Sequence, residues 1–307
     1  MSFPSKLFFS GTLALCTLWA VPGRAAGQFP SPPRLDHAFV LVLENHSLGE
    51  VIGNPAMPAL NALARRYGYA ANYTGVAHPS LPNHVALIAG SPMGLRSDDP
   101  RRRFTGDTLA SQLERSGRGW RGYFQGLPAA GSQADYAGLY GKKHNPFLLS
   151  ADIAASPSQA ANAVPYGQFA DDLRAGRVPA LAFVVPDLCH DMHGAAGCRD
   201  RAALDRAGDD FARTWAQEVM ESAVWKPGAV MVITFDEGEG GDRAGGGGRV
   251  ATIVAAPDGP RGRVSPHPNT PYSLLRSLED GFGLSPLRGA AGAAPMTDLF
   301  GSGQAGK

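Results

Sequence analysis

The chain has 307 residues and a formal net charge of +1, with 28 Lys and Arg residues against 27 Asp and Glu residues. This balance gives no general attraction to a polyanion, so a nucleic-acid-binding protein is not expected. Hydrophobic residues make up 44% of the chain, which at this length allows one large domain with a sizeable core and excludes a disordered chain.

The amino-terminal segment predicts export from the cytoplasm. An apolar run covers residues 7–21 after Lys6, and small residues follow it up to Ala25. Because this run is short for a membrane span, residues 1–25 are interpreted as a cleaved signal peptide, with an uncleaved membrane anchor as the alternative. We therefore expect a periplasmic or secreted protein with no membrane span after cleavage.

Apolar runs of strand length alternate with stretches of helical periodicity along the rest of the chain. Such continuous runs are typical of strands buried on both faces of a parallel sheet. Residues 26–307 are therefore expected to form a single α/β domain, a three-layer sandwich with a mostly parallel central sheet, and two domains divided at the loop-rich residues 128–164 are the alternative. Strands are predicted over residues 38–43, 181–185, 230–235 and 250–255, and helices over residues 56–67, 82–89, 108–116, 166–175, 202–222 and 271–281.

Acidic and amide residues follow three of the predicted strands. Ligands bind beyond the carboxyl ends of strands in an open parallel sheet, so these side chains are expected to converge. Desolvated carboxylates repel one another unless a cation lies among them, and the group therefore predicts a divalent metal site of unknown identity and number. A helix cap or a solvated loop position is the alternative for each acid taken alone. The residues are Glu44, Asn45, Asp187, Asp191, Asp236 and Glu237.

A serine stands where the helix following residue 78 is expected to begin, in the sequence His78-Pro79-Ser80-Leu81-Pro82-Asn83-His84. The unpaired N–H groups and the positive dipole end of a helix suit an anion. A nearby metal would favour the Ser80 alkoxide as a nucleophile, and the Asn83 amide could donate to a phosphoryl oxygen. The alternative role for Ser80 is a simple N-cap.

Two cysteines, Cys189 and Cys198, remain after removal of the signal peptide. In an exported protein such a pair is predicted to form a disulfide, with two buried thiols as the alternative.

Stretches in one consistent order over residues 37–284 resemble the bacterial phosphoesterase family, which contains secreted acid phosphatases and phospholipases C. The string around Ser80 is also similar to the Thr-Phe-Pro-Asn-His string of nucleotide pyrophosphatases, and both belong to the wider alkaline-phosphatase-like group. The resemblance implies the alkaline-phosphatase-like fold and a nucleophilic hydroxyl beside divalent metal. The stretches are HAFVLVLENHSLGEVIGNPAMPALNALA, HPSLPNHVALIAG, KKHNPF, PDLCHDMH, VITFDEGEGG and PYSLLRSLEDGFGL.

The resemblance also implies roles for individual residues. Ser80 matches the nucleophile, and Asp187 with Asp191 matches the Asp-x-x-x-His ligand pair of the pyrophosphatases, with Asp191 in place of the histidine. Lys143 and His144 match a Lys-His-Asn-Pro string and would hold phosphate or protonate the leaving group, with a surface loop contact as the alternative. Metal ligands are implied at Glu44, Asn45, Asp236 and Glu237.

One departure from the family concerns the start of the last predicted helix. Family members often read Asn-His-Tyr-Ser where this chain has Thr270-Pro271-Tyr272-Ser273, so a histidine for a second metal is missing. His267 is the alternative ligand, and one or two metals both stay open.

Other histidines and a basic run are weaker candidates. His46 and His84 are expected to support the ligands by hydrogen bonding. His190 and His193 are expected either to bind metal or to line the pocket. The run 101–103 of three arginines is interpreted as a solvated loop, with an anionic head group as the alternative partner.

These residues together predict an exported, metal-dependent phosphomonoesterase of the acid phosphatase type, acting through a phosphoserine at Ser80. Its expected partner is a small phosphate ester or a phospholipid head group. A phospholipase C-type phosphodiesterase is the first alternative, and a phosphate-binding or metal-binding protein without turnover is the second.

Overall fold

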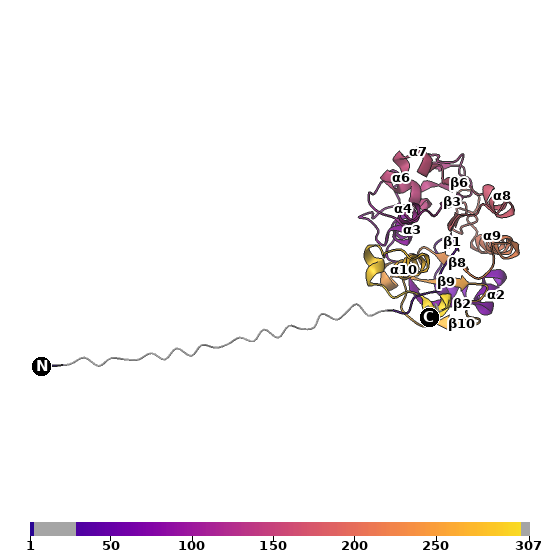
Figure 1. Ribbon diagram of the computed structural model, residues 1–307. Helices are drawn as coiled ribbons and strands as arrows, with labels where there is room; N and C mark the ends of the chain where they lie inside the picture. The colour runs from indigo at the N-terminus through magenta and orange to yellow at the C-terminus, as the bar shows by residue number, and fades with distance from the viewer. Residues whose placement is uncertain (3–28, 302–307) are drawn as a thin grey trace.

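The computed structural model describes residues 1–2 and 29–301, so nearly all of the predicted signal peptide lies outside the described residues. An eight-stranded sheet forms the centre of the molecule, in the order β10-β2-β9-β8-β1-β7-β3-β6 (Figure 1). Its strands are β1 (His37–Leu43), β2 (Gly68–Thr74), β3 (Trp120–Phe124), β6 (Ala163–Pro165), β7 (Leu181–Val185), β8 (Ala229–Phe235), β9 (Arg249–Ala255) and β10 (Arg263–Ser265). The two short strands β4 (Tyr136–Ala137) and β5 (Tyr140–Gly141) pair separately.

Helices cover both faces of the sheet, which confirms the predicted α/β architecture. Figure 1 shows α3, α4 and α10 on one face and α2, α8 and α9 on the other. The longer helices are α2 (Pro58–Arg66), α3 (Ser80–Ala89), α4 (Leu109–Arg115), α8 (Gln168–Arg174), α9 (Arg201–Glu221) and α10 (Pro271–Phe282). The short ones are α1 (Leu48–Val51), α5 (Pro146–Leu149), α6 (Ala151–Ala155), α7 (Pro157–Ala160), α11 (Thr297–Phe300) and the 3₁₀ turns η1 (Lys142–His144), η2 (Ala244–Gly246) and η3 (Arg288–Gly292).

All four predicted strands are present, but β9 is antiparallel to its neighbours, whereas the prediction placed it in the parallel part of the sheet. It pairs antiparallel with both β8 and β2, whereas β1 pairs parallel with β7 and β8. The connection between β8 and β9 contains only the short turn η2, and a parallel neighbour would need a longer crossover, usually a helix. The carboxyl end of β9 therefore lies at the opposite edge of the sheet from the carboxyl ends of β1, β7 and β8.

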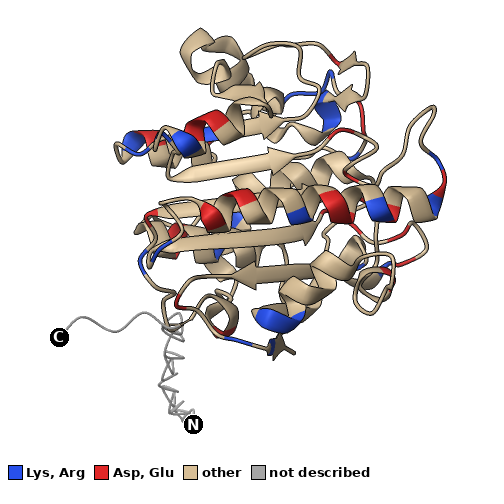
Figure 2. Ribbon diagram, turned by 90° about the vertical axis from the view of Figure 1, so that its right-hand side faces the viewer, with Lys and Arg blue, Asp and Glu red and all other residues tan. Residues whose placement is uncertain are grey.

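The core lies on both faces of the central strands. Every residue of β7 and β8 is buried, and β1 is buried from Ala38 onwards. Figure 2 shows Asp, Glu, Lys and Arg on the outer helices and loops, while the strands in view are tan. Phe147 and Leu149 of α5 belong to the same buried cluster as Leu41, so the loop-rich stretch packs on this sheet. Among residues 1–2 and 29–301, no helix combines the length and apolar character needed to cross a membrane.

Candidate active site

The carboxyl ends of β1 and β8 place acidic residues side by side. Leu43 pairs with Phe235 in the parallel register, so Glu44 and Asp236 leave the sheet at the same level. The Asn45 N–H donates to Asp236 Oδ1 at 3.2 Å, and the Glu44 N–H donates to the carbonyl of Asp191 at 2.8 Å. Loops from three strands are thus joined at one edge, as the sequence predicts.

The Ser80 hydroxyl lies within this group of acids. Its Oγ is 2.8 Å from Glu44 Oε2 and 3.0 Å from Glu237 Oε1, and the side-chain oxygen of Asn45 is 3.5 Å away. Ser80 is the first residue of α3, and Pro79 holds the N-cap position, so Ser80 is not the helix cap. With only 1% of its surface exposed, the hydroxyl is held against two carboxyl groups that can accept its proton.

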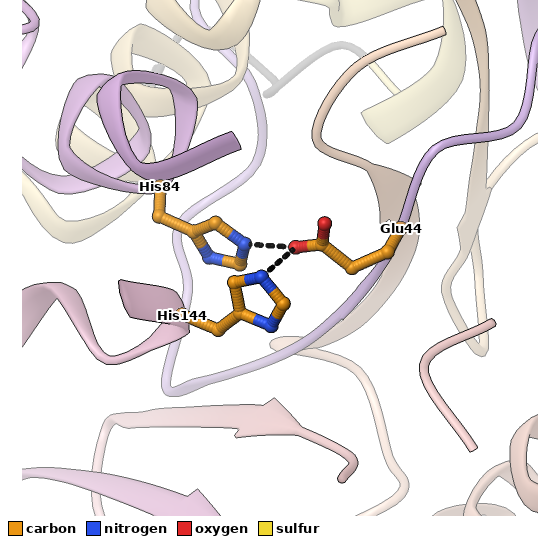
Figure 3. Close-up of side chains that lie close together, drawn as sticks. All are labelled: Glu44, His84 and His144. Carbon is orange, nitrogen blue, oxygen red and sulfur yellow. Dashed lines mark hydrogen bonds and ion pairs between the residues drawn. The ribbon is translucent and has the colours of Figure 1, made fainter. Parts of the chain in front are cut away.

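Two histidines approach Glu44 from the other side (Figure 3). His84 Nε2 is 2.5 Å and His144 Nε2 is 3.3 Å from Glu44 Oε1, and His144 Nδ1 is 3.0 Å from Asp191 Oδ2. Ligand atoms of Glu44, His84 and His144 all lie within 4.8 Å of one another. The sequence predicted His84 as a residue that supports the ligands and His144 as a residue that holds phosphate or protonates the leaving group. It did not predict that both would group with Glu44, although His84 stands four positions after Ser80 on the same helix face.

Burial shifts the pKa values of these groups so that the neutral form of each is favoured. It raises the pKa of Glu44 to about 8. It also raises the pKa values of Asp191 and Asp236 well above their usual range, with further repulsion from Glu44. The pKa values of His84 and His144 are lowered, again mainly by burial. Each effect disfavours the charged form, and the site as a whole needs a compensating cation if its acids are to ionise.

The donor atoms fit a divalent metal ion. Among the described residues, four buried atoms here make no hydrogen bond, namely Asp236 Oδ2, Glu237 Oε2, His84 Nδ1 and His144 Nε2. Two of them lie within ion-pair distance of a neighbour, Glu237 Oε2 of His78 and His144 Nε2 of Glu44. Carboxylate, amide and imidazole donors together suit a hard or borderline divalent cation. Glu44 belongs both to the oxygen-rich side with Asn45, Asp236 and Glu237 and to the side with the two histidines.

Glu237 is held in place by a histidine that the sequence did not single out. His78 Nδ1 is 2.5 Å from Glu237 Oε2, and His78 Nε2 is 2.7 Å from the carbonyl of Asp242. Burial raises the pKa of Glu237, and the neighbouring His78 partly offsets this rise. His78 therefore connects the loop before Ser80 with the glycine-rich loop after β8.

The side chains of Asp187 and Asn83 both bind nearby backbone groups, and metal binding by Asp187 stays a prediction. Asp187 Oδ1 accepts the N–H groups of Cys189 and His190, each at 3.1 Å, and pairs with the His190 ring at 2.8 Å, so its contacts lie within its own turn. Asn83 Oδ1 accepts from Val76 N at 2.8 Å, and its Nδ2 donates to Ala77 O at 2.7 Å. The Asn83 amide thus holds the loop before Ser80 and is already engaged there.

Lys143 contacts two other side chains near the site, Asp98 and His193. Lys143 Nζ is 2.8 Å from Asp98 Oδ2 and 2.9 Å from His193 Nε2. Burial opposes the charge on Lys143, but the attraction of Glu44 and Asp98 outweighs it, and the lysine pKa is raised. Asp98 was not predicted, because it lies in a loop without a recognisable motif.

The remaining candidates lie away from Ser80 or support it indirectly. His46 Nδ1 is 2.8 Å from the carbonyl of Glu44 and its Nε2 is 2.9 Å from Asp205, so it fixes the end of β1. His267 is exposed, with its ring 3.9 Å from Asp298, so nothing in the described contacts brings it to the site in place of the histidine missing at Pro271. Arg101 pairs with Asp99 on the surface, as a solvated loop would.

The predicted disulfide is confirmed. Cys189 and Cys198 are joined, and the bridge closes the loop that carries Asp191 and His193.

A match to the Phosphoesterase family covers residues 53–285. The chain belongs to this family, and it is a phosphate ester hydrolase. It is 30% identical to a phosphatidylinositol-3-phosphatase of Mycobacterium tuberculosis, over 92% of this chain and 88% of that protein. It is 25% identical to an acid phosphatase of Aspergillus fumigatus, over 70% of this chain and 48% of that one. The chain spans about half the length of the fungal acid phosphatases it matches.

Solved structures show the same fold. A protein of the alkaline phosphatase superfamily from Vibrio parahaemolyticus superposes with a TM-score of 0.58 at 12% identity, over 88% of this chain and 74% of that one. A phosphonate monoester hydrolase from Silicibacter pomeroyi gives 0.55 at 12% identity, over 89% and 78%. The predicted alkaline-phosphatase-like fold is thus confirmed.

Proposed function

We propose that this phosphoesterase is an exported, metal-dependent phosphomonoesterase in which Ser80 is the nucleophile. The observation that carries the proposal is the position of Ser80 Oγ, 2.8 Å from Glu44 and 3.0 Å from Glu237 at the start of a helix. Relatives named acid phosphatase and phosphatidylinositol-3-phosphatase support a monoester substrate. The disulfide supports an oxidising compartment.

The oxygen-rich side of the site prepares Ser80 for attack. A divalent cation held by Glu44, Asn45, Asp236 and Glu237 would act as a Lewis acid that favours the alkoxide form of a hydroxyl. Glu44 or Glu237 accepts the Ser80 proton as Oγ forms a bond to phosphorus, and the ester P–O bond breaks with its electron pair leaving on the alcohol oxygen, which takes a proton from water. Water then attacks the phosphoserine, restores the Ser80 hydroxyl and releases phosphate.

The opposite side of the site is suited to the charge on the phosphate. The Leu81 N–H belongs to the first turn of α3, where the unpaired amides and the helix dipole favour an anion. The Leu81 N–H and the Lys143 ammonium donate to the two different oxygens of the Asp98 carboxylate, so both donors converge. Donors fixed in this way stabilise negative charge as it develops on the non-bridging oxygens.

Replacing the nucleophile tests the proposal directly. Ser80→Ala removes the attacking oxygen, and we expect hydrolysis of a simple aryl phosphate to fall by about 10³-fold or more. Ser97→Ala, an exposed serine in the following loop, is the control that keeps full activity. Acid quenching and mass spectrometry of the wild type would locate phosphate on Ser80. Undiminished turnover by Ser80→Ala rules the nucleophile out, and release of phosphocholine from phosphatidylcholine without monoester turnover would replace the monoesterase by a phosphodiesterase.

A further inference from the structure

Asp98 accepts hydrogen bonds from both groups that the proposed mechanism assigns to phosphate binding, the Leu81 N–H and the Lys143 ammonium. Its Oδ1 accepts the Leu81 N–H at 3.0 Å, and its Oδ2 is 2.8 Å from Lys143 Nζ. The loop between α3 and α4 therefore returns to the start of α3 and places a carboxylate beside the residue that follows the nucleophile. The carboxylate thus accepts from the same two donors that the proposed mechanism assigns to the non-bridging oxygens of a phosphate group.

Lys143 does not depend on Asp98 alone for its position. His193 Nδ1 is 2.9 Å from the carbonyl of Gly194, to which it donates, so His193 Nε2 is left as an acceptor for the lysine 2.9 Å away. The ammonium group thus stays directed into the site when Asp98 leaves.

Asp98 can leave without a large desolvation cost. Its side chain is 30% exposed, whereas that of Lys143 is 7% exposed. Rotation of the carboxylate toward solvent restores its hydration, while Leu81 and Lys143 have few other acceptors in reach. The neighbouring Asp99 holds the turn through Arg101, so the loop backbone keeps its shape when the Asp98 side chain moves.

We propose that Asp98 is an internal competitor for the phosphate group, bound to the Leu81 N–H and Lys143 in the free enzyme and displaced when substrate or product phosphate binds. The inference rests on the proposed function, because it assigns these two donors to the phosphate of the ester. Its consequence is weaker binding of inorganic phosphate after each turnover, and hence faster product release.

Titration of the purified protein with inorganic phosphate, followed by calorimetry, tests this inference. Asp98→Asn removes the competing charge and Asp98→Ala removes the acceptor as well. We expect both to bind phosphate about tenfold more tightly than the wild type, which is the effect of freeing about one charge-assisted hydrogen bond. Asp99→Asn makes the same charge change one residue away on the exposed Arg101 pair and should stay within about twofold of the wild type. The inhibition constant for phosphate against an aryl phosphate should follow the same order.

The outcomes separate this inference from the proposed function. Phosphate affinity that is unchanged or lower in both Asp98 variants overturns the inference, because Asp98 would then be holding Lys143 in place. An equal gain in Asp99→Asn also overturns it, since net charge alone would explain the effect. The calorimetric titration needs no turnover, so a protein that shows the Asp98 effect but hydrolyses no monoester refutes only the proposed function.

Discussion

Two regions of this molecule that each hold a fully buried carboxyl group can be compared, the carboxyl edge of the sheet and helix α10. Glu44 and Glu279 are both 0% exposed, and burial raises the pKa of each to about 8. Glu44 meets a serine hydroxyl, other acids and two imidazoles, whereas Glu279 accepts the Leu287 N–H at 2.9 Å and holds the chain after its own helix. A raised pKa therefore marks burial, and what makes one region a site is the convergence of a nucleophile with groups of both charges.

The strongest way to separate the two regions is to neutralise one carboxylate in each. Asp236→Asn replaces a carboxylate metal ligand of the proposed site by a neutral amide. We expect kcat/KM to fall by about 10³-fold together with weaker metal binding. Glu279→Gln should keep both the turnover and the bound metal of the wild type. Steady-state kinetics and elemental analysis of dialysed protein measure the two quantities. Full activity in Asp236→Asn would remove this residue from the site.

The positive charge near Ser80 offers a second distinction, because Lys143 binds Asp98 and His193, whereas the cation of α10, Arg276, pairs with Asp280 of its own helix. Lys143→Met should lower kcat/KM by about 10²-fold, mostly through a higher KM, since a buried charged donor to the phosphate is lost. Lys142→Met is a matched control, because Lys142 is also buried but binds Asp135 and the carbonyl of Gln133. We expect it to lose stability while its KM stays within about threefold. Equal KM values in the two variants would contradict a role for Lys143 in phosphate binding.

The smallest effect on turnover is expected at Glu279, where the change acts on stability instead. Its folded pKa of about 8 lies above the usual 4.5, so its contribution to stability is complete below pH 4.5 and is lost as the pH rises through 8. Glu279→Gln has no charge to bury, and its free energy of unfolding should exceed that of the wild type by up to about 5 kcal/mol at pH 9, the value of about 3.5 pKa units, with little difference at pH 4.5. Urea titrations at several pH values measure this difference, with exposed Glu221→Gln as control. A difference that does not vary with pH would show that Glu279 does not titrate as described.

The sequence predicts much of the fold because its central strands are continuous apolar runs. It misses β2, which is only partly buried, and β3, where Arg121 interrupts an otherwise buried run. It also misses β6 and β10, edge strands of three residues each. It also assigns β9 to the parallel pattern, because an apolar run carries no information about strand direction.

The site could be predicted where backbone topology decides the position of a residue. Glu44, Asp236 and Ser80 follow strand ends or begin a helix, and the fold brings them together. Asn83 and Asp187 instead make hydrogen bonds to nearby backbone N–H groups, a competition that depends on turn geometry rather than on residue spacing. Asp98 reaches Leu81 only because a long loop folds back.

The bridge between Cys189 and Cys198 matters for anyone who prepares this protein. Expression in a reducing cytosol leaves two thiols in its place, and the segment that presents Asp191 to His144 and His193 to Lys143 then loses its covalent restraint. A batch with poor turnover therefore needs a thiol assay before its chemistry is judged, because an unlinked segment and an intrinsically slow enzyme look alike in a rate measurement.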